Sequence, residues 1–293
     1  MRNGRFQRAD TWRTCTLRPS LVASRQLFVA WPARVDSEAE SMERLARELR
    51  SVQTMFPWIR AVKFGSYNFA TRAFGSRIDP EIRILAALGP CRLAIDVGGN
   101  WGQSIYALKR VVRPDMVISF EPNPELAQKL AKEFSCDPSI IVEPFALGSQ
   151  PSQSDFFIPS YRGFVYDGLA SLSYDKAAGW LNAKRVARFD ARKLKIKEHQ
   201  VPVRTLDSLN LSPDIIKIDV QGHELEVIRG AAQTLSRSRP AIVVESPSDE
   251  LIGQLDEIGL KHFGLSGDKL EHGYRSNVNS VFLCPDKHGS LVN

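Results

Sequence analysis

The residues best placed to do chemistry begin with a glycine-rich run, Asp96-Val97-Gly98-Gly99-Asn100-Trp101-Gly102. The run follows an apolar stretch and opens a helical pattern. Gly98 and Gly102 let the backbone pass close to a ligand, and free N–H groups at a helix start can bond polar ligand atoms. The spacing fits the dinucleotide fingerprint G-x-G-x-x-G poorly. The run therefore predicts a cofactor-binding turn of another kind.

A second candidate is Glu121, in Phe120-Glu121-Pro122-Asn123, about twenty residues further on. Pro122 ends the predicted strand sharply and so holds the Glu121 carboxylate at the edge of the sheet. An acid in this place can accept hydrogen bonds from both ribose hydroxyls of an adenosine cofactor. Alone, such an acid is more often a turn residue. After a glycine turn, the cofactor interpretation is favoured.

Asp219, His223 and Glu245 are the candidates for the reaction itself. Asp219 ends an apolar stretch and could orient or deprotonate a substrate hydroxyl, or hold a divalent ion with Glu245. Two acids without a third make a weak metal site. His223 titrates near neutral pH and could be a general base, or could be a solvated helix end. The sequence leaves three candidates for the general base: Asp219, His223 or a water molecule. Lys217 is predicted to form an ion pair with Asp219.

Short apolar segments alternate with helical patterns from residue 92 onward, which predicts a parallel sheet covered on both faces. Two further segments at 260–265 and 278–284 flank a polar stretch and are predicted to form a hairpin, giving an antiparallel edge. The expected fold is a Rossmann-like, seven-stranded α/β sheet. The parallel strands are expected at 93–97, 117–121, 140–145, 215–220 and 241–245, with helices at 102–112, 124–134, 224–235 and 248–258.

The N-terminal third divides into two predicted parts before the sheet domain at 91–293. Residues 1–34 form a basic tail predicted to be disordered, and residues 35–90 a helical cap with helices near 37–52 and after Asp79-Pro80. Within the sheet domain, residues 149–203 break the alternation and are rich in aromatic and then basic residues. An insertion of this kind at the carboxyl edge of a sheet is expected to face the substrate, although a plain surface excursion is the alternative.

The glycine run and the segment around Glu121 resemble the FkbM family of methyltransferases. So do the motifs Thr205-Leu206-Asp207-Ser208-Leu209, Ile216-Lys217-Ile218-Asp219-Val220-Gln221-Gly222-His223-Glu224, Val227-Ile228-Arg229-Gly230-Ala231 and Pro240-Ala241-Ile242-Val243-Val244-Glu245. The similarity spans about residues 78 to 283. It implies an S-adenosylmethionine-dependent O-methyltransferase, with a sugar, glycoconjugate or natural-product hydroxyl as acceptor. Gln221 departs from the family, which usually has Glu there.

The resemblance also assigns residues to the S-adenosylmethionine site. Asp96 supports the turn and meets the methionine amino group, with Gly98, Asn100 and Gly102 around it. Glu121 and Asn123 belong to the same site, and Phe145 is placed to touch the adenine, although plain core packing explains Phe145 equally well. Two alternatives remain open: a nicotinamide-type oxidoreductase or epimerase, and a methyltransferase fold that only binds.

The composition of the chain limits the classes of partner and location that are expected. The net charge is +6, and residues 1–34 hold seven arginines against one aspartate, so the rest of the chain, with 32 basic and 32 acidic residues, is neutral. No nucleic-acid partner is therefore expected. Four scattered cysteines form no zinc or disulfide pattern. No apolar run is long enough to span a membrane, and a cytoplasmic location is expected. The oligomeric state is left open.

Overall fold

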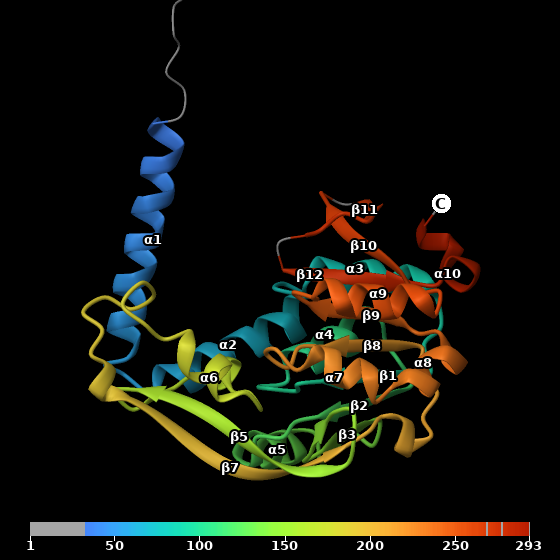
Figure 1. Cartoon of the computed structure of the whole chain (residues 1–293), viewed down its shortest axis with the longest axis horizontal. Coiled ribbons are helices and arrows are strands. Elements are labelled where there is room, and N and C mark those ends of the chain that lie inside the picture. Colours follow the sequence, from blue (N-terminus) through green and yellow to red (C-terminus); the bar gives the residue numbers. More distant parts are fainter. Residues whose placement is uncertain (1–32, 268, 277, 293) are drawn as a thin grey trace, which may run out of the picture. The chain divides into compact units, whose positions relative to one another are not determined.

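The computed structural model describes residues 33–267, 269–276 and 278–292 (Figure 1). The chain divides into two compact units, Met1–Glu43 and Arg44–Asn293. The predicted basic tail falls outside the described residues except for its last two positions, and α1 (Ala33–Gln53) runs across the boundary between the units. Within the described ranges, no helix is long and apolar enough to cross a membrane.

The second unit is built on an eight-stranded sheet with the order β11-β10-β12-β9-β8-β1-β2-β3. The strands β1, β2, β3, β8 and β9 run parallel to one another, whereas β10, β11 and β12 are antiparallel to their neighbours. The bounds are β1 (Leu93–Val97), β2 (Met116–Phe120), β3 (Ile140–Glu143), β8 (Ile215–Ile218), β9 (Ala241–Glu245), β10 (Lys261–Ser266), β11 (Lys269–His272) and β12 (Asn279–Leu283).

Each face of this sheet carries its own apolar core. In β1, Ala94 packs into one core and Ile95 and Val97 into the other, because successive side chains of a strand point to opposite faces. Burial of each large aliphatic side chain stabilises the fold by about 1.5–3 kcal/mol. Two covered faces explain why the central strands are short, continuous apolar runs rather than alternating ones.

Helices supply the outer layers. On one face lie α3 (Pro80–Leu85), α4 (Gln103–Val111), α5 (Pro124–Glu133) and α10 (Pro285–Val292), and on the other α7 (Glu224–Arg229), α8 (Ala232–Ser238) and α9 (Asp249–Glu257). The helix α2 (Ile59–Phe74) packs against α4. A short 3₁₀ helix, η1 (Ala86–Leu88), follows α3.

The fold class predicted from the sequence is confirmed, with two local differences. The predicted antiparallel pairing of the segments at 260–265 and 278–284 is present as β10 and β12, and β12 also pairs with β9. The polar stretch between them contains an additional strand, β11, which follows Gly267 and pairs with the other edge of β10, so the sheet has eight strands rather than seven. The predicted helix at 224–235 is interrupted at Gly230, where a Cβ would lie 1.9 Å from the backbone oxygen of Gly148.

The insertion predicted at 149–203 is a curved ribbon with its own small sheet (Figure 1). Two long antiparallel strands form it, β5 (Ser152–Tyr161) and β7 (Leu194–Arg204). The small sheet is completed by β6 (Phe164–Val165) and by β4 (Ala146–Leu147), which precedes the insertion. The insertion also contains α6 (Tyr174–Gly179) and the 3₁₀ helices η2 (Asp167–Leu169) and η3 (Ala191–Lys193), and a further 3₁₀ helix, η4 (Asp207–Leu209), follows β7.

The strand order reverses direction between β1 and β8. From β1 the chain builds outward through β2 to β3, and it then returns to place β8 on the other side of β1. In open parallel sheets, ligands bind in the crevice beyond the carboxyl ends of the strands at such a reversal. The loops after β1 and β8 carry the glycine run and Asp219, so the fold brings the predicted site residues to this crevice.

Candidate functional site

The glycine-rich run forms the loop between β1 and α4. Gly98 and Gly102 have φ angles of +94° and +85°, which side chains of other residues rarely allow. A Cβ at Gly98 would lie 2.0 Å from the backbone oxygen of Asp219. The loop can therefore pass the end of β8 only with glycine at this position. Asn100 also has a positive φ, +47°.

Glu121 follows β2 and is 5% exposed. Its carboxylate accepts hydrogen bonds from the backbone N–H groups of Asn100 (2.6 Å) and Asn123 (2.7 Å), one on each oxygen. Burial raises the pKa of Glu121 to about 7, although both N–H groups favour the charged form. A carboxylate has roughly four acceptor positions. Glu121 thus keeps acceptor capacity for a ligand after the protein has used one position on each oxygen.

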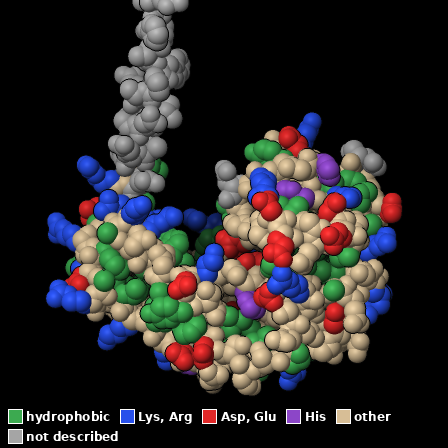
Figure 2. All heavy atoms as spheres, viewed as in Figure 1, with side chains coloured by type: hydrophobic (Ala, Val, Ile, Leu, Met, Phe, Trp, Pro, Cys, Tyr) green, Lys and Arg blue, Asp and Glu red, His purple; other side chains and the backbone are tan. Residues whose placement is uncertain are grey.

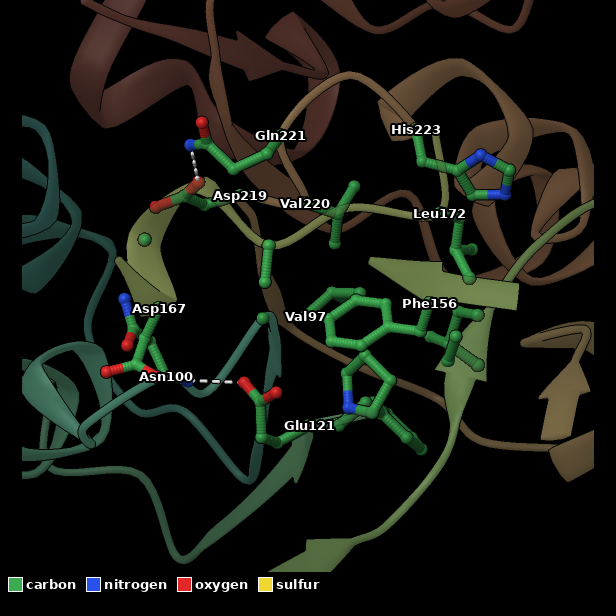
Figure 3. A pocket seen from close by; sticks show the side chains of 17 residues that line it. Val97, Asn100, Glu121, Phe156, Asp167, Leu172, Asp219, Val220, Gln221 and His223 are labelled. Atoms are coloured by element: carbon green, nitrogen blue, oxygen red, sulfur yellow. Dashed lines mark hydrogen bonds between the residues drawn. The ribbon is translucent and has the colours of Figure 1, made fainter. Parts of the chain in front are cut away.

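Glu121 and the glycine loop line a cavity at the carboxyl ends of the central strands, which we term the β1–β8 hollow (Figure 3). It contains about 640 Å³ of empty space, its mouth included. The sheet side contributes Val97, Gly98, Asn100, Phe120, Glu121, Pro122, Ala146, Leu147, Asp219, Val220, Gln221 and His223, and the insertion contributes Phe156, Asp167, Gly168, Ala170 and Leu172.

Two neighbouring cavities share residues with the β1–β8 hollow. The α2 hollow shares Gly98, Asn100 and Asp219 with it and is completed by Lys63, Phe64, Tyr67, Arg77, Asp79, Ile82, Gln103, Ser104, Ala107 and Lys217. The β9 hollow shares Gln221 and is completed by Leu169, Lys176, Trp180, Gly222, Glu224, Leu225, Glu245, Ser246, Ser248, Glu250 and Leu251.

Three predicted cofactor residues lie behind the lining of these hollows. Asp96 is fully buried and accepts a hydrogen bond from the Ser119 hydroxyl (2.8 Å), and burial raises the pKa of Asp96. Asn123 begins α5, where its side chain accepts from the N–H of Glu125. Phe145 packs against Phe120, with ring centroids 5.3 Å apart. The structure therefore gives these side chains supporting positions, and Gly102 likewise sits against Leu130 at the start of α4.

Asp219 is the centre of a polar cluster beyond β8. The amide of Gln221 donates to Asp219 (2.9 Å) and to Glu245 (2.7 Å), and the Lys217 ammonium lies 3.4 Å from Asp219. Burial opposes the charge of Asp219, but Lys217 and the hydrogen bonds from Glu245 and Gln221 lower its pKa to about 2. Burial and the hydrogen bond to Asp219 raise the pKa of Glu245 to about 8. The predicted Lys217–Asp219 ion pair is therefore present.

His223 lines the same hollow but at a different place. In Figure 3, Val220 lies between Asp219 and His223, and the imidazole is beside Leu172 at the Phe156 end. Burial lowers the pKa of His223, which favours the neutral ring at pH 7. The structure thus does not bring the two predicted catalytic residues together.

The metal hypothesis gains no support from the described part of the chain, which holds no group of three or more His, Cys, Asp and Glu side chains in a metal-binding arrangement. Asp219 and Glu245, the two predicted ligands, both accept from the Gln221 amide. The amide bonds one oxygen of each acid, Oδ1 of Asp219 and Oε2 of Glu245, so a hydrogen-bond donor already bridges the pair. Gln221, the departure from the family pattern, is thus the residue that joins these acids.

The sequence interpretation missed a buried contact between the glycine loop, the insertion and α2. The indole N–H of Trp101 donates to Asp167 (2.8 Å), and the Arg60 guanidinium lies 3.4 Å from the same carboxylate. Phe64 stacks on Trp101, with centroids 5.0 Å apart. Trp101 is visible within the glycine run, but its partners Phe64 and Asp167 lie 37 and 66 positions away in the sequence, and no spacing rule connects them.

Residues 96–275 match the Methyltransferase FkbM domain, which is more than half of the chain. The chain belongs to the FkbM methyltransferase family. The model that matches is that of a methyltransferase domain, which favours methyl transfer over the nicotinamide alternative. The matched range begins at Asp96 in β1 and includes the glycine loop, the insertion, Asp219 and Glu245.

This member of the FkbM family is 27% identical over 149 residues to the hexuronic acid methyltransferase AglP of Haloferax volcanii; the match covers 50% of this chain and 53% of that one. The chain thus spans about half the length of this curated relative. Among solved structures, it is similar to methyltransferase FkbM from Methylobacillus flagellatus (17% identity, 86% of this chain and 60% of that one, TM-score 0.42) and to Aeropyrum pernix fibrillarin with bound S-adenosylmethionine (12%, 71% and 75%, 0.36).

Proposed function

We propose that this methyltransferase transfers the methyl group of S-adenosylmethionine to a hydroxyl oxygen of a saccharide, glycoconjugate or hydroxylated natural product. The buried carboxylate of Glu121 carries the proposal, because it faces the β1–β8 hollow with acceptor capacity that ribose hydroxyls can use. The similarity to a relative that methylates hexuronic acid supports a sugar acceptor.

The residues of the β1–β8 hollow fit S-adenosylmethionine in one orientation. Glu121 would hold the ribose, and the apolar Phe156 and Leu172 would flank the adenine at one end. At the other end, the side-chain oxygen of Asn100 is buried and has no hydrogen-bond partner among the described residues. It can accept from the amino group of the methionine portion. The cationic side chains of the α2 hollow, which opens at this end, suit the methionine carboxylate.

When bound, S-adenosylmethionine supplies a methyl group on a sulfonium, whose sulfur keeps the electron pair as the acceptor oxygen takes the methyl. The protein has to hold the acceptor oxygen in line and receive the hydroxyl proton. Asp219 lies where both requirements meet, beside Gly98 and Asn100. Because the hydroxyl becomes strongly acidic as its oxygen gains the methyl group, even a carboxylate of low pKa can accept the proton. Alignment of the acceptor oxygen with the methyl group supplies most of the rate enhancement.

Asp219, rather than His223, is therefore the proposed proton acceptor and orienting residue. His223 lies at the Phe156 end of the hollow, which is assigned to adenine. We expect Asp219→Asn to lower kcat by about 10²–10⁴-fold, the usual contribution of a positioned acid–base group. His223→Asn should leave kcat within threefold and change mainly the KM for the donor.

The test is transfer of an isotopically labelled methyl group to a panel of hydroxylated saccharides and natural products, with the product identified by NMR as a methyl ether. Asp219→Asn and His223→Asn are assayed beside the unaltered protein. A labelled amine or carboxyl ester, or a kcat loss confined to His223→Asn, would contradict the assignment. Donor binding without transfer to any acceptor would favour a methyltransferase fold that only binds.

A further inference from the structure

Two consecutive helices of the second unit carry apolar side chains on their outer sides. The part of α1 from Arg44 to Gln53 belongs to this unit, and α2 follows it after a short turn. The described residues include fifteen large hydrophobic side chains that are exposed, and nine of these lie between Leu45 and Phe74. Single exposed apolar residues are ordinary, but a concentration of this kind marks an interaction surface.

The polar side of α1 packs against the insertion. The Arg50 guanidinium donates to the backbone oxygen of Arg185 (3.1 Å), and the Ser51 hydroxyl donates to that of Ala187 (3.0 Å). Three apolar side chains recur at helical spacing on the opposite side of the helix and are 51–60% exposed: Leu45, Leu49 and Val52. An amphipathic helix of a globular protein normally packs its apolar side inward. In α1 this arrangement is reversed.

The helix α2 also has an apolar stripe on its outer side. On the inner side, Phe64 stacks on Trp101, and the Asn68 amide donates to the backbone oxygen of Trp101 (2.7 Å). Three side chains on the outer side recur at helical spacing and are 58–65% exposed: Trp58, Val62 and Phe69. We term the six outward side chains of the two helices the α1–α2 face.

Positive charge accompanies the α1–α2 face. Residues 44–74 contain six lysines and arginines against one acidic residue, Glu48. Among the described residues, Arg60 is the one cation of this segment in an ion pair, with Asp167, so four positive charges are left uncompensated. The insertion adds three exposed cations where it contacts α1: Lys184, Arg185 and Arg188. Figure 2 shows Lys and Arg side chains gathered at the end of the ribbon that lies beside α1.

This charge distinguishes between the bodies that could cover the α1–α2 face. A second copy of the chain would bring the same cations against it, and residues 1–34 carry seven arginines against one aspartate. Like charges placed opposite one another disfavour binding in both cases. A lipid surface with anionic headgroups has the complementary charge. Leucine, tryptophan and phenylalanine beside lysine and arginine is also the composition of helices that lie in a membrane interface.

We propose that the α1–α2 face and its neighbouring cations bind the surface of a bilayer that contains anionic lipids. The apolar side chains enter the boundary between headgroups and acyl chains, with Trp58 at the depth that indole rings prefer. The lysines and arginines contact the lipid phosphates. The helix α2 also lines the α2 hollow with Phe64 and Tyr67, and this cavity includes Asp219. Membrane binding would therefore place the proposed reaction centre near the lipid surface.

The experiment is flotation of the purified full chain with vesicles of phosphatidylcholine alone, or of phosphatidylcholine with about one third phosphatidylglycerol. The apolar variants are the double substitution Trp58→Ala/Val62→Ser and the single substitution Phe69→Ser. Tyr174→Ala/Val278→Ser is the matched control, because these side chains are 55% and 54% exposed and lie outside the α1–α2 face. Circular dichroism establishes that each protein is folded, and sedimentation velocity without lipid reports the oligomeric state.

We expect the unaltered protein to float with the anionic vesicles, and its partition coefficient to be at least about tenfold lower with phosphatidylcholine alone. Each apolar variant should lower the partition coefficient on anionic vesicles about tenfold, with the control within twofold. Equal binding to both vesicles, no flotation, or undiminished flotation of the folded apolar variants would each overturn the inference. So would a dimer without lipid that Trp58→Ala/Val62→Ser dissociates, because a second copy would then cover the face. Flotation needs neither donor nor acceptor, so its outcome is separate from that of the proposed methyl transfer.

Discussion

Replacement of Gly98 by alanine is the sharpest perturbation of the glycine loop. The added Cβ would lie 2.0 Å from the backbone oxygen and 3.1 Å from the backbone carbon of Asp219. Both atoms belong to the main chain, so no side-chain rotation can relieve the contact. Gly98 also has a φ of +94°, which alanine adopts only with strain. The loops after β1 and β8 must therefore separate.

The magnitude follows from these two costs. A left-handed backbone conformation costs a residue with a Cβ about 1–2 kcal/mol, and overpacking of a tight contact costs about 1–3 kcal/mol. The free energy of unfolding should thus fall by about 2–5 kcal/mol, which for a domain of this size lowers the melting temperature by roughly 5–15 °C. Because the displaced loop holds Asn100 against Glu121, the Kd for S-adenosylmethionine should rise at least about tenfold.

Thermal unfolding and donor titration are measured on Gly98→Ala beside Gly253→Ala. Gly253 lies inside α9, and a Cβ there has no heavy atom within 4 Å, so this control should gain about 0.5–1 kcal/mol of stability. If Gly98→Ala keeps both the melting temperature and the Kd of the unaltered protein, the assigned close approach of the two loops is wrong.

Three further predictions concern buried polar groups. Since the pKa of Glu121 lies near 7, lowering the pH below 7 should protonate it and raise the Kd for S-adenosylmethionine by up to about tenfold per pH unit; calorimetry of Glu121→Gln should show no such dependence. Lys217→Met leaves Asp219 and Asp96 without the ammonium that faces them, so urea unfolding should show a loss of about 3–5 kcal/mol; wild-type stability would contradict this. The hydroxyl of Thr234 is buried without a partner among the described residues, and Thr234→Val should raise stability by about 1 kcal/mol in thermal unfolding; a loss would show an unrecognised partner.

The central strands of the sheet could be predicted from the sequence because they are continuous apolar runs. β1 and β9 begin and end at the predicted residues, because a strand covered on both faces is a mostly apolar run, and Asp96 and Glu245 come only at or next to its carboxyl end. The ribbon was missed for the opposite reason: β7, with the sequence LKIKEHQVPVR, is largely exposed and polar. The helix α2 was also missed, because its buried positions include Asn68 and Thr71 and an internal Gly65 weakens the helical pattern.

The position of a residue was predictable where it depends on local backbone geometry. Gly98 and Glu121 are fixed by neighbouring strand ends, and both lie in the β1–β8 hollow as expected. Asp167 was not predictable, because its contact with Trp101 joins segments far apart in the chain. The placement of Asp219 and His223 on different sides of Val220 likewise depends on how the loop after β8 turns, with Gln221 at a φ of +54°.

The most direct test of the central claim is calorimetric titration of the purified protein with S-adenosylmethionine and S-adenosylhomocysteine, repeated with Glu121→Ala. The proposed donor site predicts micromolar binding of both ligands, about −8 kcal/mol, and a rise in Kd of at least about 100-fold in the variant, which loses a buried hydrogen-bonded carboxylate at the ribose. Circular dichroism establishes that each protein is folded. No binding of either ligand by the folded protein, or equal binding by Glu121→Ala, would contradict the account.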